Sequence, residues 1–252
     1  MKLLALDFDG VISDSAREAF VVALRSFREL RPACGLPEIA RASEAPDLYA
    51  AFVDRMPLGN RAEDFAVVLA TLDAGVPLPD QAAYDAFHAS LDADELAAFH
   101  TRFYEVRSAW AAKDPEGWLA EMSPYPEVLP VLKRHANDVI LAIATAKDRA
   151  SVERLLVRYG IASLFPPERV LDKEAGRSKR AHLEALAGRT GVAFSDITFV
   201  DDKLNHLASV ASLGVRCALA SWGYNGEREV RAARSQGHQV LRLESLESDL
   251  FS

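Results

Sequence analysis

The chain opens with a short apolar segment that has no possible strand partner near it in the sequence. Leu3-Leu-Ala-Leu6 has the composition of a buried strand, and Gly10 follows shortly after it. From residue 16 to about 124, apolar residues recur at helical spacing and prolines separate the segments. Since a strand must pair, we expect residues 2–6 to join a sheet built from later residues, which makes 16–124 an insertion.

From about residue 125 onward, strand-like and helix-like segments alternate. Val139–Thr145 is a continuous apolar run of the kind that a buried parallel strand requires. This alternation predicts an α/β fold with a doubly wound, mainly parallel sheet, formed by residues 1–15 and 125–252, and an all-helical domain over 16–124. The other strands are expected at 170–171, 197–200, 216–220 and 239–243, with helices at 127–136, 149–159, 179–190, 204–213 and 228–236.

The insertion contains several helical patterns. They cover residues 16–30, 47–56, 61–74, 80–90 and 92–113. Ser15-Ala-Arg-Glu18 has the spacing of a capping box, in which the Ser and Glu side chains each bond a backbone N–H at the start of a helix. We therefore expect the first of these helices to begin immediately after Ser15.

Composition limits the classes of partner. The chain has 252 residues, a formal net charge of −8 and a pI of about 5.3, which disfavours nucleic acid polymers and anionic membranes. Cys34 and Cys217 have no metal-ligand spacing, and no apolar run reaches the length of a membrane span. We expect a soluble, cytoplasmic protein whose partner is a small molecule, and the sequence does not indicate an oligomeric state.

Two carboxylates lie where the first predicted strand ends. Asp7 and Asp9 are two residues apart, so they would point to the same side if the strand continued regularly, and Gly10 allows a sharp turn after them. Such a pair suits metal-assisted chemistry, with one carboxylate as nucleophile and the other as proton carrier. The alternative is a strand that ends in a solvated acidic turn.

Cationic and hydroxyl side chains follow other predicted strands. Thr145 closes the strand 139–144 and can donate to a phosphate oxygen, or it can bond the backbone as β-branched strand residues often do. Lys179 begins a predicted helix, and Lys173 is its competitor at a strand end. Either lysine can neutralise phosphate charge, although a solvated surface role is common for a single lysine.

A second acidic pair follows the strand predicted at 197–200. Asp201 and Asp202 are adjacent, with Asn205 further on, and a nearby cation such as Mg²⁺ would relieve their repulsion. Solvated loop acids are the alternative. Ligands of open α/β sheets gather at the carboxyl ends of the strands, and every group above falls at such an end.

Taken in order, these segments resemble the four motifs of the haloacid dehalogenase (HAD) superfamily. The resemblance covers the whole predicted core, and the insertion resembles a helical cap of the C1 type. Asp202 and Asn205 depart from the commoner family form, in which glycine precedes the first acid and a second acid follows later. The matching segments are Asp7-Phe-Asp-Gly-Val-Ile-Ser-Asp-Ser15, Thr145, Lys179 and Val200-Asp-Asp-Lys-Leu-Asn205, with further likeness at 125–133 and 221–224.

The resemblance implies roles for the acids. Asp7 would be the nucleophile that takes the phosphoryl group as an aspartyl-phosphate, and Asp9 would protonate the leaving oxygen and later deprotonate water. Mg²⁺ would be held by Asp7, the Asp9 backbone carbonyl and Asp201, with Asp202 bound directly or through water. The family's dehalogenases lack an acid at the position of Asp9, so its presence favours phosphoryl transfer.

The resemblance also implies substrate contacts. Thr145 and Lys179 would bind the transferring phosphoryl group, and Gly10 would supply flexibility or an N–H. Lys147 and Arg149 are expected near the mouth of the site, and Arg61, with Asn60 beside it, is the candidate contact from the cap. Trp110 and Trp118 are expected in the core rather than a pocket, and all six histidines, including His88, His100 and His135, are expected to be structural.

The predicted function is a Mg²⁺-dependent phosphatase that hydrolyses a small phosphorylated metabolite. A phosphomutase that reuses the aspartyl-phosphate is the alternative within the same superfamily. A non-catalytic binding protein on the same fold is the alternative from another class. The sequence does not indicate the substrate.

Overall fold

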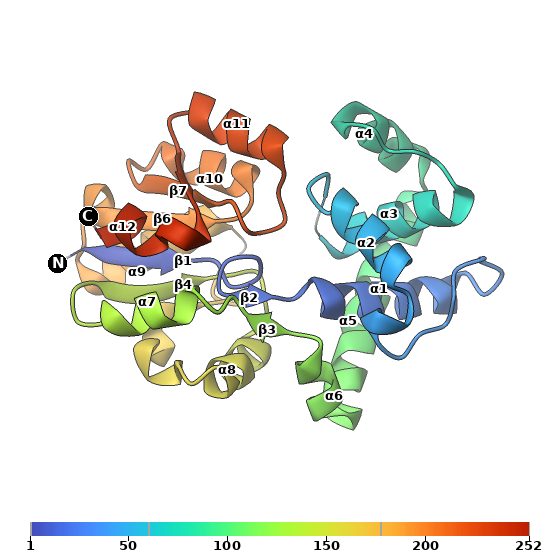
Figure 1. The fold of residues 1–252 in the computed structure, drawn as a ribbon, viewed down its shortest axis with the longest axis horizontal. Helices are drawn as coiled ribbons and strands as arrows, with labels where there is room; N and C mark the ends of the chain where they lie inside the picture. The colour runs from blue at the N-terminus through green and yellow to red at the C-terminus, as the bar shows by residue number, and fades with distance from the viewer. Residues whose placement is uncertain (1, 60, 177, 252) are drawn as a thin grey trace. The chain divides into compact units, whose positions relative to one another are not determined.

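A computed structural model describes residues 2–59, 61–176 and 178–251, and the chain in it forms two compact units. One unit, called here the sheet unit, comprises Met1–Asp14 and Pro124–Ser252. The other, the helical unit, comprises Ser15–Ser123. Figure 1 labels the elements of both, and each unit is described by itself.

The sheet unit contains a parallel sheet of six strands in the order β5-β4-β1-β6-β7-β8. The opening strand lies in its middle, because Leu3 is in register with Ile140 of β4 on one side and with Ile197 of β6 on the other. The predicted fold class is thereby confirmed. The strands are β1 (Leu3–Leu6), β4 (Ile140–Ala144), β5 (Val170–Leu171), β6 (Ile197–Asp201), β7 (Arg216–Ala220) and β8 (Gln239–Leu241).

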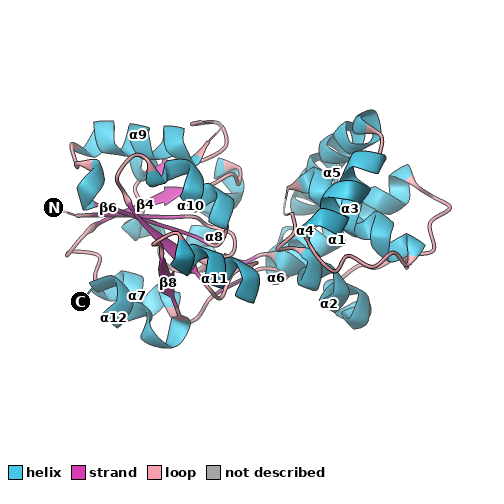
Figure 2. Cartoon of the chain, turned by 90° about the horizontal axis from the view of Figure 1, so that it is seen from above, coloured by secondary structure: helices cyan, strands magenta, loops and turns pink. Residues whose placement is uncertain are grey.

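Helices cover both faces of this sheet. In Figure 2, α9 and α10 lie on one face, whereas α7 and α12 lie on the other. Side chains alternate along a strand, so Leu3 and Ala5 of β1 pack with Leu183 of α9 and Leu207 of α10. The helices of the unit are α7 (Val128–Arg134), α8 (Arg149–Arg158), α9 (Lys179–Thr190), α10 (Leu204–Ala211), α11 (Glu227–Ser235) and α12 (Leu246–Phe251).

The helical unit contains six of the described helices, packed around aromatic side chains. Phe52, Phe65 and Phe103 form a chain of ring contacts with centroids 5.3 and 5.7 Å apart, and all three are buried. The helices are α1 (Ala16–Leu30), α2 (Pro46–Arg55), α3 (Ala62–Ala74), α4 (Gln81–Ser90), α5 (Ala93–Lys113) and α6 (Pro115–Ala120).

The elements that the sequence did not predict are short. They comprise α6, α12, five single-turn 3-10 helices, and strands β2 (Ser13–Asp14) and β3 (Ser123–Pro124), which form a separate two-stranded ladder. A hydrophobic period needs several residues to become visible, so single turns and the two-residue strands β2 and β3, which contain no apolar pair, escape it. The 3-10 helices are Ala42–Glu44, Ala162–Leu164, Pro167–Arg169, Phe194–Asp196 and Leu243–Ser245.

The predicted capping box at the start of α1 is wrong. Among the described residues, Ser15 does precede the helix, but its side chain makes no capping hydrogen bond. Glu18 instead lies fully buried inside the helical unit and accepts hydrogen bonds from Arg107 Nε and Nη2, at 2.7 and 2.8 Å. The Trp118 indole donates to the same carboxylate at 3.0 Å. The carboxylate thus joins α1, α5 and α6 rather than capping a helix.

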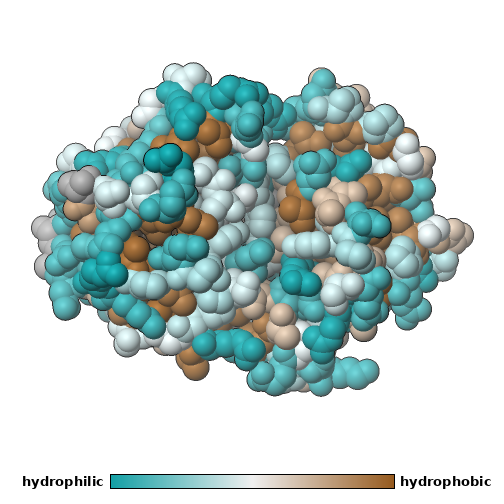
Figure 3. Space-filling view, in the orientation of Figure 1, coloured by the Kyte–Doolittle hydropathy of each residue, from teal (hydrophilic) through white to brown (hydrophobic). Residues whose placement is uncertain are grey.

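The visible face in Figure 3 mixes hydrophilic and hydrophobic patches. Large apolar side chains reach the surface singly, as Leu30 and Val157 do, which is ordinary for globular proteins. Each helix that the structure describes is too short or too polar to span a bilayer.

The buried Glu18 cluster predicts a large stability effect. Replacing Glu18 with Gln should lower the free energy of unfolding by about 3 kcal/mol, because it leaves the largely buried Arg107 guanidinium without a countercharge. Chemical denaturation followed by tryptophan fluorescence measures this, since two of the three tryptophans lie in the helical unit. Glu29→Gln on the same helix is the control, because its pair with Arg102 is exposed. Equal midpoints for the two variants would contradict this account.

Candidate functional site

The site lies where three neighbouring strands end. Strand β1 stops at Leu6, and its register with β4 and β6 pairs Leu6 with Ile143 and Val200. The next residue, Asp7, continues this alignment, because its N–H donates to Val200 O at 2.9 Å. Asp7, Thr145 and Asp201 therefore come to the same edge of the sheet although they are far apart in the sequence.

Lys179 lies between two carboxylates at this edge. Its Nζ is 2.7 Å from Asp7 Oδ2 and 3.1 Å from Asp201 Oδ2, and it donates to Ala144 O at 2.8 Å. Helix α9 begins at Lys179, and Ser178 caps it by accepting from Ala181 N. All three charged side chains are almost entirely excluded from solvent. One ammonium thus ties β1, β4 and β6 together.

Burial and mutual repulsion shift the pKa values of this cluster. Burial raises the pKa of Asp7 to about 7, against the opposing effect of the Lys179 ammonium, and the Asp201 charge reinforces the rise. Burial also works to raise the pKa of Asp201, but Lys179 and His206 outweigh it and hold that pKa below its usual range. The pKa of Lys179 is raised, because Asp201 and Asp7 together exceed the effect of burial.

His206 belongs to this cluster, and sequence reasoning missed it. Its Nδ1 lies 3.1 Å from both carboxylate oxygens of Asp201. Asn205, which the sequence analysis singled out, is exposed, and its Oδ1 accepts from the His206 N–H at 3.0 Å. The position of His206 in the sequence could have indicated it. Helix α10 begins at Leu204, so residue 206 lies in the first helical turn after the strand that ends at Asp201.

The donor set fits a divalent cation. One carboxylate oxygen each from Asp7 and Asp201 and one ring nitrogen of His206 all lie within 4.8 Å of one another. Carboxylates are the ligands that hard divalent cations prefer. A cation here would also favour ionised Asp7, whose pKa is raised partly by Asp201.

Asp9 faces a second lysine. Lys147 Nζ lies 3.2 and 3.4 Å from the two oxygens of Asp9, and the Lys147 side chain is only 1 % exposed. The backbone after Asp7 does not continue as a strand, since Phe8 O accepts from the N–H groups of both Ile12 and Ser13 at 2.9 Å. The two acids consequently have different cationic partners, Lys179 for Asp7 and Lys147 for Asp9.

Thr145 is buried beside this second lysine. Its Oγ1 accepts from Lys147 N at 3.1 Å, and its own N–H donates to Leu171 O at 2.8 Å. A hydroxyl that accepts from the backbone retains a proton with which it can donate. The turn after β4 thus supplies a hydroxyl and an ammonium at the same strand end.

Asp202 supports the loop around Gly10. Its Oδ2 accepts from Tyr224 N at 2.8 Å, and a Cβ placed on Gly10 would lie 2.6 Å from its Cγ. Gly10 also has a φ of 76°, which L side chains rarely adopt. Burial raises the pKa of Asp202 to about 6, although the Lys203 ammonium opposes this. The carboxylate packs against the first loop and the segment after β7.

Other predicted contacts have different surroundings. Lys173 is exposed, whereas Lys179 is buried in the cluster. Arg149 is bound to the region of β5, because its Nε is 3.3 Å from Asp172 Oδ2 and its guanidinium donates to the carbonyls of Pro167 and Val170.

The candidates from the insertion belong to the helical unit. Arg61 is exposed at the start of α3, and its N–H donates to Asp64 Oδ2 at 2.9 Å. Asn60 lies outside the described residues. Trp110 and Trp118 are both buried.

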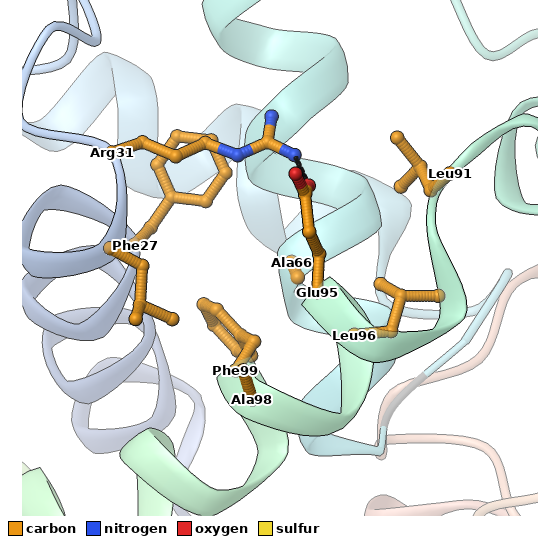
Figure 4. A pocket seen from close by; sticks show the side chains of 9 residues that line it. Phe27, Arg31, Ala66, Leu91, Glu95, Leu96, Ala98 and Phe99 are labelled. Carbon is orange, nitrogen blue, oxygen red and sulfur yellow. Dashed lines mark hydrogen bonds and ion pairs between the residues drawn. The ribbon is translucent and has the colours of Figure 1, made fainter.

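The helical unit contains an apolar pocket, shown in Figure 4. Phe27, Leu96 and Phe99 line it, and the ion pair between Arg31 and Glu95, 2.6 Å long, lies beside it. Its volume is about 140 Å³, below the several hundred Å³ typical of pockets for organic ligands. The carboxylate and lysine cluster at the sheet edge is therefore the stronger candidate site.

Comparisons with known proteins find a matching family model and curated relatives. A family model described as "Hydrolase: haloacid dehalogenase-like hydrolase" matches residues 1–214. The chain is 30% identical over 103 residues to "Magnesium-dependent phosphatase 1" of Homo sapiens, a match that covers 40% of this chain and 56% of that protein. It is 26% identical over 119 residues to "Phosphoglycolate phosphatase" of Synechococcus elongatus, covering 46% and 54% respectively. The chain thus spans about half the length of the curated relatives that it matches.

Solved structures share the fold over nearly the whole chain. A predicted phosphoglycolate phosphatase from Haemophilus somnus has a TM-score of 0.66 at 22% identity, covering 98% of this chain and 97% of that one. A putative phosphoglycolate phosphatase from Lactobacillus delbrueckii has a TM-score of 0.69 at 15% identity, covering 100% of both chains. At these identities the likeness establishes the fold.

The position of Lys179 predicts a measurable loss of stability. Lys179→Met should lower the free energy of unfolding by about 3 kcal/mol in metal-free buffer, because the carboxylates of Asp7 and Asp201 then lose the ammonium that lies between them. Adding Asp201→Asn to that variant should restore part of the loss.

Lys173→Met is the matched control and should leave the denaturation midpoint almost unchanged, because that side chain is exposed. Unfolding of Lys179→Met and Lys173→Met at the same denaturant concentration would show that Lys179 does not stabilise this cluster.

Proposed function

The chain belongs to the haloacid dehalogenase-like hydrolase family, and we therefore propose that it is a phosphatase acting on a small phosphorylated metabolite. The observation that carries the proposal is the position of the Asp7 carboxylate. It lies directly after β1, forms an ion pair with Lys179 and is close to Asp201. Phosphoryl transfer needs an oxygen nucleophile with cations around it to offset the negative charge of the phosphate. The cluster supplies both.

In the first step, Asp7 attacks the phosphorus atom. A bond forms between a carboxylate oxygen and phosphorus, and the bond from phosphorus to the substrate oxygen breaks. Asp9 gives its proton to that leaving oxygen, so that an alcohol departs rather than an alkoxide. Thr145, Lys179 and Lys147 bind the phosphoryl oxygens while charge redistributes among them.

In the second step, water hydrolyses the aspartyl-phosphate. Asp9 is now ionised. It accepts a proton from the attacking water while the oxygen of that water bonds to phosphorus. The bond between phosphorus and the Asp7 oxygen breaks, which releases inorganic phosphate and restores both acids. Lys147 lies 3.2 Å from Asp9 and orients this carboxylate in both steps.

We propose magnesium as the cofactor, held by Asp7, Asp201 and the backbone carbonyl of Asp9. When bound, the ion neutralises charge on the phosphate and on the nucleophile. Asp202 acts through the loop that it supports, since its carboxylate accepts from Tyr224 N and packs against Gly10. A relative named "Magnesium-dependent phosphatase 1" supports the choice of ion.

We propose that residues 1–15 and 125–252 form the catalytic core and that the helical section 16–124 acts as its cap. Closure of a cap excludes water before chemistry and selects the substrate. Arg61 is the candidate cap residue for the substrate, since its side chain is exposed and cationic.

A screen of phosphorylated metabolites for turnover would identify the substrate. A relative is named "Phosphoglycolate phosphatase", so phosphoglycolate joins sugar phosphates and nucleoside monophosphates as the first compounds to test. Release of inorganic phosphate identifies a phosphatase, whereas an isomerised sugar phosphate without phosphate release identifies a mutase. A protein that turns over none of a broad panel would contradict an enzymatic function.

The two acids of the first loop predict different kinetic losses. Asp7→Asn should abolish turnover, because the amide cannot form the acyl-phosphate. Asp9→Asn should lower kcat by about 10²–10⁴-fold while the binding of the phosphate ester persists, because only proton transfer is lost. Steady-state phosphate release and equilibrium binding of the same ester measure the two effects.

Asp138→Asn is the control, since that exposed residue pairs with His135 on the surface of the sheet unit. It should retain full activity. Unchanged kcat in Asp9→Asn would refute the proton-transfer role.

A further inference from the structure

His206 brings a nitrogen donor to a cluster that is otherwise made of carboxylates. Its Nδ1 lies 3.1 Å from both oxygens of Asp201. One carboxylate oxygen of Asp7, one of Asp201 and one ring nitrogen of His206 lie within 4.8 Å of one another. Asp201 is fully buried, and His206 is 26 % exposed at its side chain. A cation held by the two carboxylates would therefore have an imidazole beside it.

The chemistry of that donor set favours transition-metal ions. Mg²⁺ is a hard ion that prefers oxygen ligands and gains little from imidazole. Imidazole suits ions such as Co²⁺, Ni²⁺ and Zn²⁺, and the affinity of sites with nitrogen donors rises from Mn²⁺ to Co²⁺ and beyond. Replacing one oxygen ligand by His206 would shift selectivity away from Mg²⁺.

The same contact has a second possible role. A neutral imidazole protonated at Nδ1 would donate to Asp201 and orient that carboxylate without touching the ion. Orientation of Asp201 would affect all divalent cations alike, whereas direct ligation would affect the transition metals far more than Mg²⁺. Selectivity between ions therefore distinguishes the two roles.

We propose that His206 is a direct metal ligand and that the site binds Mn²⁺ and Co²⁺ more tightly than Mg²⁺. The inference rests on the proposed function, because it places the ion at the same carboxylates. The property that His206 would change is the selectivity of the site between divalent cations. This selectivity can be measured without any substrate.

Isothermal titration calorimetry of the metal-free 252-residue chain with Mn²⁺, Co²⁺ and Mg²⁺ tests this. His206→Asn should weaken Co²⁺ and Mn²⁺ binding by about tenfold or more and change the Kd for Mg²⁺ by less than about threefold. His88→Asn in the helical unit is the control and should leave all three constants unchanged. Circular dichroism and thermal denaturation establish that each variant is folded.

Pulsed electron paramagnetic resonance of bound Mn²⁺ supplies a second readout. The wild-type spectrum should contain a hyperfine coupling to one ¹⁴N nucleus, and His206→Asn should remove it. An equal loss of affinity for Mg²⁺ and Co²⁺ in the variant, or a wild-type spectrum without nitrogen coupling, would overturn the inference and leave the phosphatase proposal standing. A wild-type protein that binds none of the three ions would overturn the metal site itself.

Discussion

The ion pairs of Lys179 with Asp7 and Asp201 hold the strand tips of this protein together. Three strands that pair side by side bring acidic residues to one edge, and two buried carboxylates in proximity would repel each other strongly. A single ammonium from the start of α9 offsets that repulsion and also bonds the end of β4 through Ala144 O. The order of the strands and the position of α9 thus determine whether the cluster can exist.

The same interaction links stability to the proposed chemistry. A nucleophilic carboxylate must be ionised and must approach an anionic phosphate, and both conditions require nearby positive charge. Burial raises the pKa of Asp7 to about 7 even with the Lys179 ammonium beside it, so a divalent cation at this cluster would help to keep the carboxylate ionised near neutral pH. Burying the Asp7 carboxylate is thus unfavourable in itself. In the proposed mechanism the same carboxylate can attack a phosphate once Lys179 and a divalent ion are present.

The sequence predicted the fold class because its signals were long and regular. The apolar run from 139 to 145 and the helices between later strands indicated a parallel sheet, and the isolated first strand implied a place within it. Glu18 illustrates what a local pattern cannot reveal. Its spacing from Ser15 matched a capping box, yet its partners Arg107 and Trp118 lie about 90 and 100 residues away along the chain.

The close approach of several candidate residues could also be expected from the order of the predicted elements. Asp7, Lys179 and Asp201 each follow or precede a recognisable element, so topology alone brings them near one edge. His206 was missed because a scattered histidine carries no signal in itself. Helix α10 begins at Leu204, and this start determines which residue of its first turn faces Asp201. His206 does so, whereas Asn205 is exposed to solvent.

In the proposed mechanism, Asp7 itself receives the phosphoryl group. Quenching the enzyme in acid during turnover of its best substrate, followed by borohydride reduction and peptide mapping by mass spectrometry, tests this directly. An acyl-phosphate on an aspartate is reduced to homoserine, so homoserine is expected at position 7. Homoserine at another acid, or none while phosphate is being released, would contradict it.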